Sequence, residues 1–396
     1  MPQRARAVLL TRPIATCFGI CVLIHAVTYL LNALLPLHVS ALGGSKTQIG
    51  MLFSVSTMAS MVLRPLVGGW TDRYGFRPVS LPGVAALLLT LTGLYWAGSP
   101  AAVVALMAGV GVANGLISTS ASALVARASP PARRGEALSL YYIASSVGWA
   151  MGPPLGLALY EAAGLGESVA VAAGATLLLG GLAWSASGEA TRPVPDAPAR
   201  LRLWSRPALP ASGALALVTL GNSSVYAFLP LYAMASGMSG NIGWFYALFS
   251  AWLIGCRVGL RGLSDRLGRG RVIAPAMALT ALACFALAIP PSVASLAAAA
   301  LLLASGAALL YPTLIALLID RAPESERGLA IGTLSASFDV GIVLGSLLVG
   351  FTVERTSYAV GFALAGALAL VGLASFLAAE RAWLRVVSRP STGVSS

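Results

Sequence analysis

The chain has 396 residues, of which 58% are hydrophobic and only 10% are charged. A soluble domain carries roughly 25% charged residues because its surface must be solvated, so this composition excludes a soluble enzyme, a disordered regulator and a disulfide-stabilised scaffold. The net charge of +12 does not indicate nucleic-acid binding, because so few charged residues cannot form a basic face. The composition predicts a protein that crosses a membrane many times.

Twelve apolar runs are long enough to cross a bilayer as helices, which takes about 20 residues each. The runs of the first half are 14–38, 47–70, 79–98, 101–127, 136–160 and 167–188. The runs of the second half are 208–234, 242–263, 271–290, 293–319, 328–353 and 357–379. The first run is longer than a signal-peptide core of roughly 7–15 residues, so we expect it to remain in the protein as a spanning helix.

A polar stretch rich in proline and arginine separates the two groups of six runs. Such a composition is typical of a linker that cannot pack into a core. The predicted organisation has four parts. They are an N-terminal six-helix bundle over 1–188, a cytoplasmic linker over 189–207, a C-terminal six-helix bundle over 208–380 and a cytoplasmic tail over 381–396.

The positions of the arginines predict the orientation in the membrane. All of them except Arg64, Arg257 and Arg355 lie in a terminus, or in or at the edge of a loop that follows an even-numbered run. Cytoplasmic loops carry an excess of Lys and Arg. Both termini are therefore predicted to be cytoplasmic, and the protein is expected as a multi-pass protein of the inner membrane of a bacterium.

Several kinds of site are not expected. The four cysteines, Cys17, Cys21, Cys256 and Cys284, lie in apolar runs without metal-ligand spacing, which predicts neither a disulfide framework nor a zinc site. No glycine-rich nucleotide-binding loop occurs, which excludes ATP-driven transport within this chain. No soluble region is large enough for catalysis. We expect no cofactor, no metal and no enzymatic activity.

An internal repeat relates the two halves of the chain. The segment Asp72-Arg73-x-Gly75 recurs 193 residues later as Asp265-Arg266-x-Gly268. The same offset relates Arg64 to Arg257, Pro82 to Pro275, Gly148 to Gly341 and Gly152 to Gly345. A shift by an even number of helices indicates a parallel duplication. Transporters with this symmetry bind substrate between their halves, near the bilayer midplane.

Two motifs stand out against this repeat. The pattern G-x-x-x-D-R-x-G-x-R follows the second run as Gly68, Asp72, Arg73, Gly75 and Arg77, and a degenerate copy follows the eighth as Arg261, Asp265, Arg266, Gly268 and Arg269. The fifth run carries Gly148-x-x-x-Gly152-Pro153-x-x-Gly156. Together with twelve spans, these motifs resemble the major facilitator superfamily, and the glycine motif is similar to that of its drug/proton antiporter branch. The stretch that matches the branch's helix-4 motif, 106–115, has no charged residue.

The resemblance implies an all-α membrane protein with 12 transmembrane helices in two six-helix pseudo-symmetric bundles. It also implies a single-chain transporter that works as a monomer. The glycines of the fifth run would allow close helix packing, which we expect between the halves. Asp72, Arg73, Arg77, Asp265 and Arg266 would hold the cytoplasmic side closed in one state, since a carboxylate there can pair with arginines and helix N-termini. The alternative is that these loops are topology anchors whose tight turns need Gly75 and Gly268.

Three ionisable residues are predicted to lie at membrane depth, where each costs at least about 2.5–3.5 kcal/mol unless it faces a cavity or a partner. Asp339 is interpreted as a proton or cation site, with a fixed ion pair as the alternative. The resemblance places helices 2 and 11 side by side, which makes Arg64 its expected partner. Arg64 and Arg257 suit bidentate binding of planar anions and look like the ligand-binding pair of nitrate/nitrite porters. An arginine before proline, as in Arg64-Pro65, is also a structural element of exporters.

Polar residues at helical spacing predict a substrate cavity, because helices 1, 4, 7 and 10 line the cavity in this family. Any one of them could instead form a helix–helix hydrogen bond worth about 0.6 kcal/mol. The candidate substrate-binding residues are His25, Tyr29, Asn32, Arg64, Asn114, Ser118, Tyr142, Trp149, Asn222, Tyr226, Arg257, Tyr311 and Asp339.

The leading functional hypothesis is proton-coupled efflux of a small amphiphilic organic molecule by alternating access. Asp339 would bind a proton or the substrate in turn, which gives exchange. The first alternative is an anion or carboxylate importer or exchanger that uses Arg64 and Arg257. In that case an anion taking Arg64 would favour a proton on Asp339, so proton and substrate would load together. A membrane receptor or a scramblase-like protein without coupling is the alternative outside coupled transport.

Overall fold

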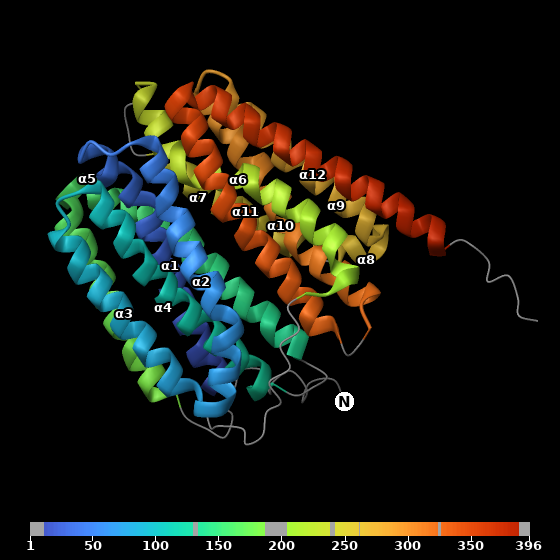
Figure 1. Cartoon of the computed structure of the whole chain (residues 1–396), viewed down its shortest axis with the longest axis horizontal. Coiled ribbons are helices and arrows are strands. Elements are labelled where there is room, and N and C mark those ends of the chain that lie inside the picture. The colour runs from blue at the N-terminus through green and yellow to red at the C-terminus, as the bar shows by residue number, and fades with distance from the viewer. Residues whose placement is uncertain are drawn as a thin grey trace, which may run out of the picture. The chain divides into compact units, whose positions relative to one another are not determined.

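The computed structural model describes residues 12–129, 134–186, 204–237, 242–260, 262–323 and 326–387 (Figure 1). These residues form helices joined by short turns and contain no β-strand. The predicted all-α class is confirmed. Of the predicted linker and tail, residues 189–203 and 388–396 lie outside the described residues.

The helices follow the predicted apolar runs. The helices of the first half are α1 (Arg12–Ala41), α2 (Lys46–Tyr74), α3 (Phe76–Trp96), α4 (Pro100–Ala128) and α5 (Arg134–Ser185). The second half begins with a short 3-10 helix, Arg206–Ala208. Its helices are α6 (Leu209–Ala235), α7 (Gly243–Gly259), α8 (Leu263–Leu267), α9 (Arg269–Ala288), α10 (Val293–Arg321), α11 (Arg327–Arg355) and α12 (Tyr358–Val387).

Ten helices of the described chain are long and apolar enough to cross a membrane, compared with the twelve runs predicted. One reason is α5, whose 52 residues include two predicted runs on either side of Gly164. Gly164 has φ 84° and ψ −167°, a conformation that glycine adopts without steric cost, so the helix direction breaks there. The other reason is α7, which has only 17 residues before the turn that leads into α8. Twelve membrane crossings remain a prediction.

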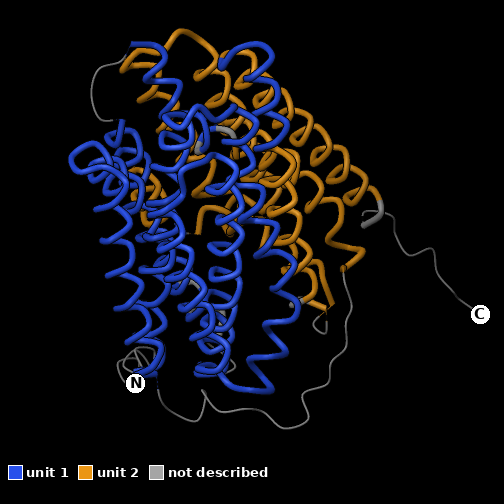
Figure 2. The backbone as a smooth tube through the Cα atoms, turned by 60° about the vertical axis from the view of Figure 1, so that its left-hand side comes forward, with its two compact units in different colours: residues 1–201, 224–251, 346–358 blue, residues 202–223, 252–345, 359–396 orange. Residues whose placement is uncertain are grey.

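The chain divides into two compact units (Figure 2). Unit 1 comprises residues 1–201, 224–251 and 346–358, and unit 2 comprises residues 202–223, 252–345 and 359–396. Helices α6, α7 and α11 each contribute one part to each unit. The division into bundles over 1–188 and 208–380 therefore stays a prediction from the sequence.

In unit 1, glycines bring α5 into backbone contact with α1. A Cβ atom added at any of the three glycines of the α5 motif would lie 2.5–2.7 Å from a carbonyl oxygen of α1. The glycines are Gly148, Gly152 and Gly156, and the oxygens belong to Val22, Ala26 and Leu30. Both sets have a spacing of four residues, so one face of α5 follows one face of α1. The predicted close packing is confirmed, but its expected place between the halves is wrong, since both helices belong to the first half.

Unit 2 contains the helix contact that is equivalent to this one in the internal repeat. A Cβ on Gly341 of α11 would lie 2.6 Å from the carbonyl oxygen of Ala216 in α6. A Cβ on Gly345 would overlap the carbonyl oxygen of Leu220, one turn further along α6. Gly341 and Gly345 are the residues that the 193-residue offset pairs with Gly148 and Gly152. The duplication seen in the sequence is therefore also a duplication of helix packing.

A second repeated contact joins α3 to α4 and α9 to α10. A Cβ on Gly83 would lie 3.3 Å from the Ala113 carbonyl oxygen, and a Cβ on Gly306 would lie 2.8 Å from that of Ala276. The offset of 193 pairs Gly83 with Ala276 and Ala113 with Gly306. In the first half the glycine is on α3, and in the second half it is on α10. Each contact therefore has a glycine on one of its two helices, and it does not matter on which.

Helix ends also repeat. Ser99 caps α4 by accepting a hydrogen bond from the Ala102 amide at 3.3 Å, and Ser292 caps α10 by accepting one from the Ser295 amide at 3.0 Å. The two serines are 193 residues apart. A serine oxygen at this position satisfies an amide that has no partner within the helix. Local sequence thus sets where these two helices begin.

The turns after Asp72 and Asp265 are alike as well. Gly75 has φ 88° and Gly268 has φ 92°, values that L side chains rarely adopt. Each glycine ends one helix and begins the next, α2 to α3 and α8 to α9. The predicted need for glycine at both turns is confirmed.

Candidate functional site

Four aromatic side chains from three helices line up in unit 1. The rings of His25 and Tyr29 on α1 are 6.3 Å apart and nearly parallel. Tyr29 lies 5.5 Å from Trp149 of α5, and Trp149 lies 4.7 Å from Phe249 of α7, edge to face. Phe249 was not predicted, because an aromatic residue in an apolar run gives no signal of its own. The row offers flat apolar faces from α1 to α7.

A chain of polar contacts runs beside these rings. Asn114 Nδ2 donates to Thr28 Oγ1 at 3.3 Å, and Ser118 Oγ donates to Asn114 Oδ1 at 3.2 Å. Tyr141 of α5 donates its hydroxyl to the Ser118 carbonyl oxygen at 3.0 Å. The predicted pair Asn114 and Ser118 thus joins α1, α4 and α5, and holds the helices that carry the rings in register.

His25 is held in one orientation by its own helix. Its Nδ1 lies 2.8 Å from the carbonyl oxygen of Cys21, and a carbonyl can only accept, so Nδ1 carries the hydrogen. In the neutral ring Nε2 then carries no hydrogen and can accept a hydrogen bond. Arg64 of α2 is close enough to interact electrostatically with both His25 and Tyr142. We call the set His25, Tyr29, Arg64, Tyr142 and Trp149 the unit 1 wall.

Asp339 is the central feature of unit 2. It is 4% exposed, and it is the only buried residue among the acidic side chains that the structure describes. It lies in the interior of α11, one turn after Ser335, whose hydroxyl is 2.9 Å from that of Tyr311 on α10. The Tyr311 ring packs 5.6 Å from Phe338. The predicted residue Tyr311 therefore lies against the α11 segment that carries Asp339.

The other candidates of unit 2 are less closely joined. Arg257 is half-buried near the end of α7. One turn or so earlier on the same helix, Trp252 donates its indole N–H to Ser305 of α10 at 2.9 Å. Asn222 on α6 has a buried Oδ1 with no hydrogen-bond donor among the described residues, and Asn32 Oδ1 in unit 1 is in the same situation. Such oxygens suit bonding to a bound molecule or water. The Tyr226 side chain lies outside the described residues.

The predicted site residues thus form two groups, one within unit 1 and one within unit 2. Arg64 belongs to unit 1, whereas Arg257 and Asp339 belong to unit 2. The predicted pairing of Arg64 with Asp339, and the predicted symmetric action of the two arginines, remain predictions.

The first aspartate motif makes contacts within unit 1. Asp72 lies 3.9 Å from Arg127 at the end of α4. Arg73 instead lies over the ring of Tyr74, at 5.4 Å from its centre. Arg77 donates from Nε to the Ala186 carbonyl oxygen at 2.9 Å and so holds the end of α5. Of the three predicted gating residues, only Asp72 is placed in an ion pair by these contacts.

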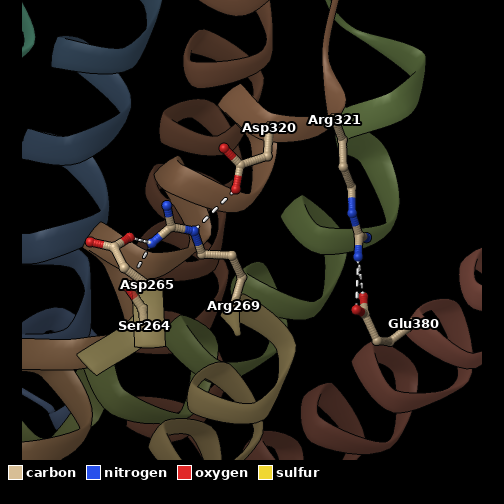
Figure 3. Close-up of polar contacts among 6 residues, drawn as sticks. All are labelled: Ser264, Asp265, Arg269, Asp320, Arg321 and Glu380. Atoms are coloured by element: carbon tan, nitrogen blue, oxygen red, sulfur yellow. Dashed lines mark hydrogen bonds and ion pairs between the residues drawn. The ribbon is translucent and has the colours of Figure 1, made fainter. Parts of the chain in front are cut away.

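The second motif has a different arrangement, shown in Figure 3. Arg269 lies between two carboxylates, with an ion pair to Asp265 and a hydrogen bond from Nε to Asp320 Oδ2 at 3.1 Å. It also donates to Ser264 Oγ at 2.8 Å. Asp265 is therefore neutralised by Arg269 at the start of α9, and its neighbour Arg266 is exposed. Asp320 was not predicted, although the 193-residue offset places it opposite Arg127.

A separate ion pair holds the end of α12. Arg321 donates to both carboxylate oxygens of Glu380, at 2.8 and 2.6 Å (Figure 3). Its guanidinium also lies over the ring of Trp383, at 4.7 Å from the centre. Both bonds come from the same nitrogen of the guanidinium group, and together with the ring contact they hold the arginine in place. This contact positions α12 against α10.

With this geometry in place, comparison with known proteins decides the family. A family model described as the Major Facilitator Superfamily matches residues 17–262 and 242–393. The chain belongs to the Major Facilitator Superfamily. Members and fold neighbours are transporters, so this superfamily protein is a membrane transporter and not an enzyme.

Two relatives of this superfamily protein are named for export and for drug resistance. The staphylopine export protein of Staphylococcus aureus is 25% identical over 371 residues, which cover 86% of this chain and 89% of that protein. The fosmidomycin resistance protein of Escherichia coli is 35% identical over 139 residues, which cover 35% of this chain and 34% of that protein.

Solved structures share the superfamily fold at low sequence identity. A peptide transporter crystallised with sulfate has a TM-score of 0.77 at 17% identity and covers 93% of this chain and 94% of its own. The human organic anion transporter MFSD10 has a TM-score of 0.64 at 19% identity and covers 92% of this chain and 99% of its own. These similarities concern the fold alone.

Proposed function

We propose that this protein is a secondary-active exporter of a bacterial inner membrane, which exchanges protons for a small amphiphilic organic molecule by alternating access. The observation that carries the proposal is the position of Asp339, in the interior of an apolar 29-residue helix and only 4% exposed. A carboxylate at such a depth costs at least about 2.5–3.5 kcal/mol. The name of the staphylopine export protein supports efflux as the direction.

The coupling follows from competition at one carboxylate. When Asp339 is ionised it attracts the cationic or hydrogen-bonding part of a substrate, and when it takes a proton that attraction is lost. A proton arriving from outside therefore releases substrate, and substrate arriving from inside displaces the proton. The exchange needs no other titrating group, which agrees with the absence of charge from 106–115 of α4.

The unit 1 wall supports an amphiphilic substrate. Tyr29 and Trp149, extended by Phe249, offer ring faces that pack against flat or apolar groups. Arg64 and the acceptor Nε2 of His25 offer polar contacts next to those rings. A ligand with one apolar and one polar end would use both parts. Asn32 of the same unit, whose buried amide oxygen lacks a donor among the described residues, would bind its hydrogen-bond donors.

The second candidate function is transport of an anion or carboxylate, and Arg64 is the observation that favours it. Its guanidinium acts on both His25 and Tyr142, so an anion bound there would meet further hydrogen-bonding groups. In this scheme Arg257 would supply a second cation, and proton and substrate would move together.

Variants of Asp339 test the leading proposal. In proteoliposomes with an imposed proton gradient, a panel of labelled organic cations, zwitterions and anions would identify a transported compound. Asp339→Asn is expected to abolish gradient-driven accumulation of that compound and to leave its downhill exchange measurable. Glu167→Gln, which changes an exposed carboxylate of α5, is the control and is expected to retain accumulation. Full accumulation by Asp339→Asn would overturn the proposal.

A further inference from the structure

Within unit 1, α2 and α11 lie in close antiparallel contact although they belong to different halves of the repeat. A Cβ on Gly350 of α11 would lie 3.0 Å from the carbonyl oxygen of Lys46, at the start of α2. One turn further on, a Cβ on Gly50 would overlap the carbonyl oxygen of Ser346. Small residues on both helices thus let the two backbones touch. Ser346 Oγ also lies 2.8 Å from the hydroxyl of Ser54.

The beginning of α2 is capped partly by its own sequence. Ser45 is the N-cap residue, and its hydroxyl accepts a hydrogen bond from the Gln48 amide at 3.1 Å. The Gln48 side chain accepts from the Ser45 amide at 2.9 Å in return. This capping box leaves the amide of Thr47, in the first turn, without a partner from α2 itself, as is normal for the first amides of a helix.

Glu354 of α11 supplies that partner. Thr47 donates from its backbone amide to Glu354 Oε2 at 3.0 Å, and the Thr47 hydroxyl donates to the same oxygen. A carboxylate suits this position, because a helix N-terminus carries partial positive charge and bonds to an ionised acceptor are stronger than neutral ones. A residue of one half of the repeat therefore completes the cap of a helix in the other half.

The next helix reinforces the same end of α2. The ammonium group of Lys46 lies 5.4 Å above the ring of Tyr358, the first residue of α12. The Tyr358 ring in turn packs 5.5 Å from the ring of Tyr232 on α6. All these residues belong to unit 1. The Thr47–Glu354 bonds thus lie next to a row of contacts that joins α2 to α12 and α6.

We propose that Glu354 is a latch of the transport cycle, a positioning residue that keeps the predicted outer end of α2 on α11. The inference rests on the proposed alternating access, in which these helix ends must separate when the outer side opens. In the closed state the carboxylate caps Thr47. In the open state water takes over both bonds, and the energetic preference for closure is lost. Glu354 therefore sets the ratio of closed to open molecules without contacting the substrate.

The internal repeat contains an equivalent of Glu354 but no equivalent of Thr47. Glu161 of α5 is 193 residues before Glu354, and the residue that matches Thr47 is Gly240, which lies outside the described residues. The matching helices α5 and α7 do meet in unit 1, through Trp149 and Phe249. Gly240 has no hydroxyl, so the position equivalent to Thr47 cannot supply the side-chain hydrogen bond that Thr47 donates to Glu354.

Distances between spin labels test the latch without any substrate. Labels are attached to cysteines placed at exposed Met51 of α2 and exposed Phe351 of α11, after the four native cysteines have been replaced by alanine. Double electron–electron resonance then gives the populations of short and long distances in nanodiscs. Glu354→Gln keeps the size of the side chain and removes its charge, and it is expected to raise the long-distance population relative to the short one by about three- to tenfold. Thr47→Val removes the hydroxyl hydrogen bond to Glu354 and keeps the one from the backbone amide. It is therefore expected to raise the long-distance population by less.

Two further variants complete the test. Glu354→Asp retains the charge and is expected to restore part of the short-distance population, which a merely steric role of Glu354 would not explain. Glu167→Gln, an exposed carboxylate of α5, is the control and is expected to leave the distances unchanged. An unchanged distribution in Glu354→Gln, or an equal shift in Glu167→Gln, overturns the latch. A shift in Glu354→Gln together with absent transport in the wild type would retain the latch and refute the proposed function.

Discussion

Arg127 and Asp320 occupy equivalent positions in the two halves, 193 residues apart, and carry opposite charges. In unit 1, Arg127 lies 3.9 Å from the motif aspartate Asp72. In unit 2, Asp320 faces the motif aspartate Asp265 through Arg269, which binds both carboxylates. The two aspartate motifs thus look alike in sequence and differ in electrostatics. The ion pair of the first motif is long, at 3.9 Å. The second motif is part of a three-residue cluster, in which Arg269 retains one carboxylate partner when the other is removed.

This difference predicts unequal roles in closing the predicted cytoplasmic side. Asp72→Asn should increase maleimide labelling of a cysteine introduced at Ser129, which is buried beside Arg127 at the end of α4. Asp265→Asn should increase labelling of the same cysteine much less, because Asp320 still holds Arg269. Both are measured in the background without native cysteines. Equal labelling in Asp72→Asn and the parent protein would refute a gating role for Asp72.

The glycine contact between α5 and α1 predicts a large effect of one methyl group. Gly152→Ala should lower the free energy of unfolding by about 1–3 kcal/mol, because the added Cβ would lie 2.7 Å from the Ala26 carbonyl oxygen. At Gly174, also on α5, an added Cβ meets nothing within 4 Å. Gly174→Ala should therefore be neutral or stabilise the helix by up to about 1 kcal/mol. Thermal unfolding in detergent compares them, and a similar loss in both would contradict the packing account.

The Arg321–Glu380 pair predicts a contribution to the stability of α12. Glu380→Gln removes the charge from a two-bond contact whose side chains are each 18% exposed, and should lower the free energy of unfolding by roughly 1–2 kcal/mol. Arg381→Gln, at the exposed neighbouring position, should change it by less than about 0.5 kcal/mol. Proteolysis of the α12 end offers a second readout. Equal stability of Glu380→Gln and the wild type would show that the pair contributes nothing.

Arg257 separates the two candidate functions. If the substrate is anionic, Arg257→Ala should abolish its binding, since the guanidinium would be a direct ligand. If the substrate is neutral or cationic, binding should change by less than about threefold, equivalent to roughly 0.6 kcal/mol. Isothermal titration with an identified acidic and an identified basic ligand gives both numbers. An equal loss for the two ligands would assign Arg257 a structural role.

The sequence was informative where a physical signal is local. Hydropathy predicted the spanning runs, Gly75 and Gly268 predicted their turns, and the spacing of Gly148 and Gly152 predicted a close helix contact. Which helix these glycines meet depends on the tertiary arrangement, so the expectation that they pack the two halves together was wrong. The position of Arg269 in the sequence also could not predict that it would form an ion pair with Asp265.

The missed residues share one property, which is that their role depends on a neighbour far away in the sequence. Phe249 is one aromatic residue in an apolar run, and only its contact with Trp149 places it in the ring row. Glu354 at the end of α11 resembles an ordinary loop-end carboxylate until Thr47, 307 residues earlier, is seen to donate to it. Comparing the halves position by position would have drawn attention to Asp320, since a charge reversal within a repeat is visible in the sequence.

The most direct test of proton-coupled export is the direction of proton movement when a transported compound is added to proteoliposomes that contain a pH-sensitive dye. If Asp339 exchanges protons for substrate, inward movement of the compound must drive protons out, so the lumen becomes more alkaline in the wild type and stays constant in Asp339→Asn. Acidification of the lumen on addition of the compound would mean that proton and substrate travel together, and would contradict the exchange mechanism.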